Sequence, residues 1–230
     1  MLTWMGIVVQ YRVDKGPAYS ILKLQLSPGE SVTIEPGSYM MHRGEVKINT
    51  SSLGVKSGLA RVLAGGESFF LNTFMAQSNA EIWAAPSIPG DIAAVELNKD
   101  EILIQDTSYL GHIGNITLTV GWRGLKGLIA EGELIWLKAA GEGIVFLNSY
   151  GAIEEINIPS GEAFVIDNGH FVALEGRVSW SIKKLGGLKT LFLGGEGLVV
   201  ETKGPGRVWI QSRNLPMFAQ ILGKFIPSKK

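Results

Sequence analysis

The sequence repeats one short phrase three times, and this phrase decides the fold. It reads Gly-Gly-Glu-Ser-Phe-Phe-Leu at residues 65–71, Glu-Gly-Glu-Leu-Ile-Trp-Leu at residues 131–137, and Gly-Gly-Glu-Gly-Leu-Val-Val at residues 194–200. Each copy places a glycine-bearing turn and a glutamate before an apolar run of the kind that forms strands. The glutamates are 66 and 63 residues apart, a period too long for a solenoid unit. The spacing therefore predicts a triplicated subdomain.

Three further phrases recur in the same order. A turn followed by an acid opens a strand at residues 26–34, 88–95 and 158–166. An acid, a variable residue and a small residue then follow at residues 35–37, 106–108 and 167–169. An aromatic strand closes each unit at residues 79–85, 141–148 and 204–211. This alignment makes Trp83, Phe146 and Trp209 counterparts, and repeated aromatics among apolar strand residues favour a core position over base stacking.

We therefore expect an all-β protein of three tandem antiparallel, β-sandwich-like subdomains in a pseudo-threefold arrangement. The predicted units are residues 1–86, 87–152 and 153–213, followed by a helical tail at 214–230. A unit of about 60 residues is marginal alone, so three units burying their apolar faces together predict one domain with a flat triangular body.

The tail carries the helix signals of the chain. Asn214 can cap the N-terminus, Pro216 suits the first turn, and Pro227 stops the helix. One face collects a candidate interaction surface, which comprises Phe218, Ile221, Leu222 and Phe225 with Lys224, Lys229 and Lys230. We expect this face to fold back on its own body. The alternative is an apolar handle for a neighbouring subunit or for peripheral contact with a membrane surface.

Composition narrows the function classes. The 230 residues include no cysteine, which excludes disulfides, thiolate metal sites and a cysteine nucleophile. Lys and Arg together number 21 and so do Asp and Glu, a balance that argues against DNA and general nucleic-acid binding. The sequence shows no signal-peptide pattern and no apolar run long enough to span a bilayer. A cytoplasmic location is the expectation.

Five segments together resemble a known family. They are residues 65–74 (Gly-Gly-Glu-Ser-Phe-Phe-Leu-Asn-Thr-Phe), 89–92 (Pro-Gly-Asp-Ile), 167–173 (Asp-Asn-Gly-His-Phe-Val-Ala), 194–198 (Gly-Gly-Glu-Gly-Leu) and 204–213 (Gly-Pro-Gly-Arg-Val-Trp-Ile-Gln-Ser-Arg). In order and spacing they look like the altered-inheritance-of-mitochondria (mitochondrial biogenesis) family. The resemblance implies three subdomains similar to the trp RNA-binding attenuation protein, within the double-stranded β-helix class. It implies no known reaction and no catalytic residues, and the missing transit segment points to a prokaryotic member.

Two sets of acids occupy repeated positions. The strand-opening acids Glu67, Glu133 and Glu196 could form a carboxylate ring for a cation or proton, and the turn acids are Glu35, Asp106 and Asp167. We favour a structural role for both sets, because a carboxylate beside a glycine turn accepts backbone N–H bonds there. Asp167 with His170 resembles a catalytic pair, but no nucleophile motif accompanies it.

The three histidines also fall one per unit, at His42, His112 and His170. Counted from the turn acids they lie at different offsets, and a one-residue slip on a strand reverses the face. We therefore expect no threefold metal site. A cupin-like metal enzyme would need a closer cluster of histidines, and no His-x-His occurs.

These observations favour a non-enzymatic structural or interaction protein without cofactor or metal. It is expected to act as a homo-oligomeric scaffold with a further protein partner. The alternative is a binding module whose clefts between subdomains hold a small molecule or, less favoured, RNA.

Overall fold

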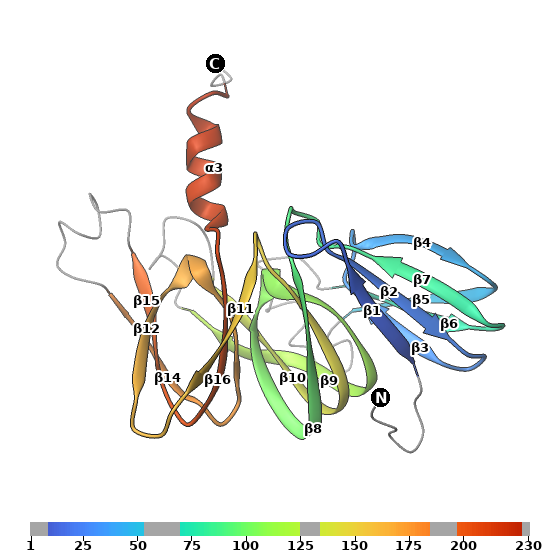
Figure 1. Cartoon of the computed structure of the whole chain (residues 1–230), viewed down its shortest axis with the longest axis horizontal. Coiled ribbons are helices and arrows are strands. Elements are labelled where there is room, and N and C mark those ends of the chain that lie inside the picture. Colours follow the sequence, from blue (N-terminus) through green and yellow to red (C-terminus); the bar gives the residue numbers. More distant parts are fainter. Residues whose placement is uncertain (1–8, 53–69, 125–133, 185–196, 227–230) are drawn as a thin grey trace.

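The computed structural model describes residues 9–52, 70–124, 134–184 and 197–226, and antiparallel strands dominate it (Figure 1). The predicted all-β class with one short C-terminal helix is confirmed. The first set of strands is β1 (Gln10–Asp14), β2 (Ile21–Leu26), β3 (Ser31–Ile34), β4 (Tyr39–Arg43), β5 (Val46–Ser52), β6 (Phe70–Ala76) and β7 (Ala80–Ala84). The last set is β11 (Ile153–Ile158), β12 (Ala163–Asp167), β13 (Phe171–Glu175), β14 (Ser179–Lys184), β15 (Leu198–Lys203) and β16 (Gly206–Gln211).

The first and last sets pair their strands in the same way. In the first set β7 lies between β2 and β4, and β6 lies between β3 and β5. In the last set β16 lies between β11 and β13, and β15 lies between β12 and β14. Each strand of β2–β7 therefore has its counterpart, in chain order, in β11–β16.

The middle set makes the same pairings with three long strands, β8 (Ile92–Gln105), β9 (Tyr109–Arg123) and β10 (Ile135–Asn148). Each of them spans the length of two strands in the other sets. The register between β10 and β8 shifts between Gly141 and Glu142. A Cβ at Gly141 would lie 2.1 Å from the carbonyl oxygen of Asn115 on β9, and φ there is +135°, so this position requires glycine. The unit boundaries predicted at 86/87, 152/153 and 213/214 cut through no strand.

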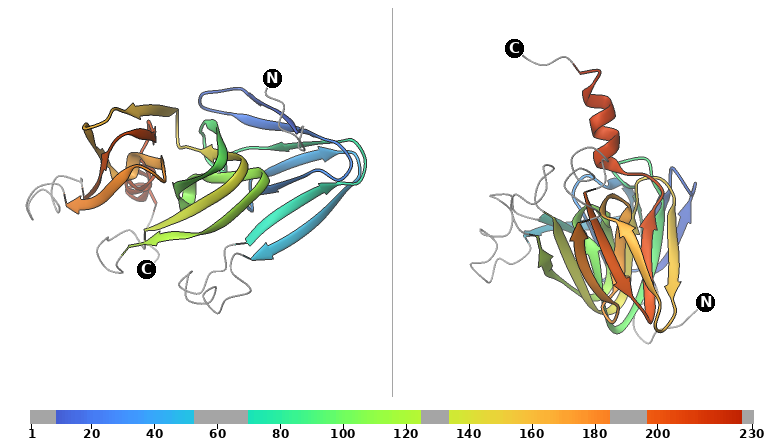
Figure 2. Two further views of the ribbon diagram at one scale, coloured as in Figure 1. Left: turned by 90° about the horizontal axis from the view of Figure 1, so that it is seen from below. Right: turned by 90° about the vertical axis from the view of Figure 1, so that its left-hand side faces the viewer.

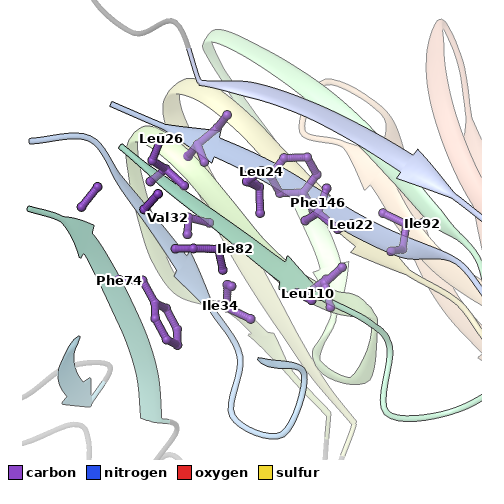
Figure 3. Close-up of a cluster of buried hydrophobic side chains, with 14 residues drawn as sticks. Leu22, Leu24, Leu26, Val32, Ile34, Phe74, Ile82, Ile92, Leu110 and Phe146 are labelled. Atoms are coloured by element: carbon purple, nitrogen blue, oxygen red, sulfur yellow. The ribbon is translucent and has the colours of Figure 1, made fainter. Parts of the chain in front are cut away.

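Strand pairing joins the three sets directly. In the first joint β3 pairs with the start of β9, and in the second joint the end of β8 pairs with β13. The buried core is continuous across the first joint. The cluster that contains the buried residues of β2 and β7 also includes Ile92, Leu110 and Phe146 from the middle set (Figure 3). Burying apolar side chains across the joints therefore holds neighbouring sets together.

The three sets lie in a row along the long axis of the molecule (Figures 1 and 2). Strand β4 belongs to one end of this row and β12 to the other. Among the described residues β4 pairs only with β7, and β12 pairs only with β15. Within the described ranges, no strand pairing between the two ends closes the row into the triangular body expected from the repeat.

The C-terminal helix α3 (Leu215–Gly223) projects away from the strands (Figure 1). The side chain of Asn214 accepts a hydrogen bond from the backbone N–H of Met217 at 3.0 Å, as predicted for its cap. None of the helix residues is buried. The expectation that this helix folds back on its own body is therefore wrong.

Candidate interaction sites at the joints and the tail

The first joint buries the edges of two strands against each other. Ile34 lies opposite Gly111, and Thr33 lies opposite His112. The backbone N–H of Glu35 extends the pairing by donating to the carbonyl oxygen of Leu110 at 3.0 Å. Adding a Cβ to Gly111 would place it 2.5 Å from the carbonyl oxygen of Thr33, so the two backbones meet more closely than any side chain allows.

A tyrosine and a histidine form the buried polar pair of this joint. The hydroxyl of Tyr109 and Nδ1 of His112 are 2.6 Å apart, and both side chains are buried. Burial lowers the pKa of His112 to about 4 and raises that of the Tyr109 hydroxyl, with Glu35 adding to the second shift. Both groups are therefore neutral at physiological pH and satisfy each other.

The same pair occurs at the free end of the row, where sequence reasoning missed it. The hydroxyl of Tyr39 and Nδ1 of His42 are 2.7 Å apart on β4. The register shifts directly after each tyrosine. On β4, Tyr39 pairs with Ala84 and Met41 pairs with Trp83. On β9, Tyr109 pairs with Leu147 and Gly111 pairs with Phe146. Aligned on this shift, both histidines lie three residues after their tyrosine. The recurring Tyr-x-x-His spacing was the signal in the sequence.

The third set carries apolar residues at these two positions. Its register shifts between Phe171, which pairs with Ile210, and Ala173, which pairs with Trp209. Leu174 therefore takes the position that the histidines have in the other two sets. Trp83, Phe146 and Trp209 pair with Met41, Gly111 and Ala173, the first paired residue after the shift in each set. His170 lies outside the alignment, and its Nδ1 is 2.8 Å from the carbonyl oxygen of Gln211.

One of the three turn acids, Asp106, does not occupy the predicted equivalent position. Gln105 and Asp167 precede corresponding 3-10 turns, η1 (Asp106–Ser108) and η2 (Asn168–His170), with φ and ψ of −58° and 135° against −59° and 134°. The acid of the middle set, Asp106, therefore comes one residue late. Because of this offset, His42 and His112 lie at different distances from the turn acids of their sets, although their positions on the strands correspond.

Each turn acid nevertheless has a contact of its own. Burial raises the pKa of Glu35 to about 7; the hydroxyl of Ser38, which donates to Oε1 at 2.9 Å, opposes this rise, and nearby Asp106 adds to it. Asn148 also donates to that oxygen, at 3.4 Å. Burial raises the pKa of Asp106 to about 6, although the N–H of Thr107 donates to its Oδ1 at 2.9 Å. Both carboxyls are thus held inside the fold.

Asp167 connects the last set to the tail. Its Oδ1 accepts hydrogen bonds from the backbone N–H of Gly169 at 2.9 Å and from Nδ2 of Asn214 at 3.3 Å. Asn214 in turn caps α3, so Asp167 fixes the position from which the helix leaves the body. It makes no hydrogen bond to His170 among those found in the described residues, and the pairing of these two residues suggested by the sequence is not formed.

The apolar side chains of α3 are exposed. They include Met217, Phe218, Ile221 and Leu222, and Phe225 just beyond the end of the helix has 80% of its surface accessible. Phe218 alone among them makes an aromatic contact with the described body, with ring centres 5.6 Å from those of Tyr150. Of the predicted interaction surface, the described residues Phe218, Ile221, Leu222, Lys224 and Phe225 are exposed, and Lys229 and Lys230 lie outside the described residues.

A cleft of about 630 Å³ opens between the middle and last sets. Lys99, Asp100, Arg177 and Arg207 are among its lining residues. Both arginines already pair with Glu175, Arg207 through Nε at 2.7 Å and Arg177 at 2.8 Å. Arg207 also pairs with Glu155 at 3.4 Å, so two carboxylates face the two guanidinium groups.

The remaining predictions concern metals, membranes and the strand-opening acids. Within residues 9–52, 70–124, 134–184 and 197–226, no group of three His, Cys, Asp or Glu side chains could hold a metal ion. In the same ranges no helix has the length and apolar character needed to cross a membrane. Glu67, Glu133 and Glu196 all lie outside the described residues.

Comparison with known proteins places the chain among its relatives. An uncharacterized protein of Streptococcus pyogenes serotype M6 is 28% identical over 229 residues, which cover 96% of this chain and 92% of the relative. A crystal structure of a protein from Streptococcus pyogenes matches with a TM-score of 0.80 at 29% identity, covering 95% of this chain and 100% of that one. The model of the family described as mitochondrial biogenesis AIM24 matches residues 11–213. Since this match spans most of the sequence, the chain belongs to the mitochondrial biogenesis AIM24 family.

Proposed function

We propose that this chain is a non-enzymatic structural protein that works in the cytoplasm as a homo-oligomeric scaffold and displays its tail helix to a partner. The observation that carries the proposal is the helix α3, which is firmly capped at its base but buries none of its residues. A helix with apolar side chains exposed on this scale is stabilised when another surface covers it. The body keeps its own core clusters without the helix.

The polar groups inside the body support a structural role. Tyr109 and His112 satisfy each other, Glu35 is held by Ser38 and Asn148, and Asp167 holds the cap of α3. A catalytic pair would instead present a base and a nucleophile to a site that substrate can reach. These contacts account for the titratable groups as parts of the framework.

Native mass spectrometry of the full chain and of a chain lacking residues 215–230 tests the proposal. We expect an integer multiple of the 24.8 kDa chain mass for the full chain. The truncated chain should keep its circular dichroism spectrum and melting temperature, because α3 contributes nothing buried, while the contacts made by the tail are lost. A full chain found only as single copies at every concentration would overturn the scaffold, and loss of folding on truncation would overturn the displayed helix.

The cleft between the middle and last sets supports a second candidate function. It could hold a small polar molecule that matches its mixture of basic and acidic side chains. The same spectra discriminate between the two functions. A mass excess that persists under gentle conditions and disappears on denaturation would favour the binding module, whereas a clean multiple of the chain mass favours the scaffold.

A further inference from the structure

The two joints inside the chain share one register. At the first joint Ile34 lies opposite Gly111, two residues after Tyr109. At the second joint Ile104 lies opposite Ala173, two residues after Phe171. The next pairs also correspond, with Thr33 opposite His112 and Leu103 opposite Leu174. Each joint therefore brings the same two kinds of strand edge together.

Each end of the row carries one of these two edges without a neighbour. Ile34, Ile104 and Ile166 each precede the aromatic residue of their set by five positions. This spacing makes β12 the counterpart of β3 and of the end of β8, and β4 the counterpart of the start of β9 and of β13. Among the described residues β4 and β12 have no partner on their outer side.

Side chains that are buried in the joints have exposed counterparts on β4 and β12, where the neighbouring strand is absent among the described residues. Tyr109, Leu110 and Gly111 are buried in the first joint, whereas all three counterparts on β4 are exposed, with Met40 at 46%. Leu103 is 8% exposed in the second joint, whereas its counterpart on β12, Val165, is 59% exposed. The two ends thus present large apolar side chains at positions that the inner joints cover.

Two other strands, β5 and β14, also lie at outer edges, but their type of edge takes part in neither joint. Strands β5 and β14 are also unpaired on their outer sides among the described residues. Their counterpart in the middle set is the second half of β9, which pairs with β10 alone. No internal joint uses this type of edge, so the joints point to β4 and β12 and not to β5 and β14.

From this continuity with the inner joints we infer that β12 of one copy adds to β4 of the next copy as an antiparallel strand. The shared register places Ile166 opposite Met41, Val165 opposite His42 and Phe164 opposite Arg43. The backbone N–H of Asp167 then donates to the carbonyl oxygen of Met40, as Glu35 donates to Leu110 in the first joint at 3.0 Å. This inference rests on the proposed homo-oligomeric scaffold and names the surface through which its copies meet.

Such a contact joins two different edges of the same chain. A head-to-tail contact of this type repeats until it closes into a ring or extends as a filament. It also covers exposed strand edges, which otherwise template unwanted pairing. Met41 is larger than Gly111 and Ala173 at the corresponding positions, but its unbranched thioether side chain adapts to irregular space.

Two variants, each blocking one end, test the inference in the full chain. Val165→Lys blocks β12 and Met41→Lys blocks β4, and both side chains are already exposed, so the folded chain should tolerate them. The control is Ile48→Lys on β5, where an apolar side chain is similarly exposed at 49%. Circular dichroism and melting temperature verify that each variant is folded, and light scattering after size exclusion gives its mass.

We expect multiple copies for the wild type and for the control, and single copies for each blocked variant. Mixing the two blocked variants should give a complex of two chains and nothing larger, because only one intact β12 and one intact β4 face each other. If the wild type assembles and both blocked variants keep its mass, the strand contact is wrong while the scaffold stands. If the wild type is a single copy, the scaffold itself fails.

Discussion

Tyr39–His42 on β4 and Tyr109–His112 on β9 are the same local structure in two surroundings. Their hydrogen bonds are 2.7 and 2.6 Å long, and both pairs follow the same shift of register. Tyr109 and His112 are buried because β3 covers them, whereas the ring of Tyr39 is exposed and stacks on Phe74 with centres 5.0 Å apart. The comparison shows that a neighbouring strand, and not the motif, decides what the motif contributes.

Cover by β3 has an electrostatic consequence for Tyr109 and His112. Burial lowers the pKa of His112 to about 4, because its charged form would lose water without gaining a compensating charge. The joint thus turns a surface hydrogen bond into an element of the core, where an unpartnered polar atom is costly. Substitutions at matched positions on β9 and β4 can therefore separate the effect of the motif from the effect of its cover.

The largest effect is expected from forcing a side chain between the two strands of the first joint. In Gly111→Val the Cβ would meet the Thr33 carbonyl oxygen, which lies only 2.5 Å from its ideal position. Overpacking against backbone should lower the free energy of unfolding by about 3 kcal/mol. Met41→Val at the corresponding position of β4 should change it by less than about 0.5 kcal/mol in single copies, where β4 is uncovered. Urea denaturation measures both, and equal effects would contradict the difference in cover.

A smaller effect is expected from breaking the buried hydrogen bond. Tyr109→Phe leaves Nδ1 of His112 without its partner and should cost about 1–2 kcal/mol, whereas Tyr39→Phe should cost less than about 0.5 kcal/mol. Adding His112→Leu to Tyr109→Phe reproduces Phe171 and Leu174 of the last set. That double variant should recover most of the lost stability in urea denaturation, because both polar partners are then replaced. Failure to recover it would mean that the pair does more than fill the joint.

Much of this arrangement was predictable from the sequence. The repeated glycine, acid and aromatic phrases predicted the strands and the correspondence of Trp83, Phe146 and Trp209, and the Asn214 cap followed from its position before Pro216. The equivalence of the histidines did not follow, because the acid of the middle set lies one residue late in its 3-10 turn. Local patterns fix such offsets only after the strands have been paired.

Burial was the other quantity that the sequence could not supply. The two Tyr-x-x-His segments look alike, and the one on β4 is exposed because no strand of the described residues pairs with the outer side of β4. The prediction that the tail helix folds back on its own body failed for a related reason. Its apolar residues indicated an amphipathic helix that needs cover, but no local signal states whether that cover comes from the same chain.

The smallest effect concerns the response of the first joint to acid. The folded-state pKa of His112, about 4, lies below the ordinary value of 6.5, so between these values the unfolded chain binds a proton that the folded chain excludes. Stability contributed by neutral His112 is therefore complete above pH 6.5 and is lost as the pH falls towards 4. Relative to the double variant Tyr109→Phe/His112→Leu, the wild type should lose on the order of 1 kcal/mol between pH 7 and pH 5.5.

Comparing the two proteins removes the opposing contributions of Glu35 and Asp106. Their raised pKa values, about 7 and about 6, mean that the folded chain binds protons more tightly there, so these carboxyls favour folding as the pH falls. Both proteins carry them, and the difference between the two urea curves isolates His112. A flat difference for the buried pair would show that water reaches His112, and the first joint would then be looser than its register implies.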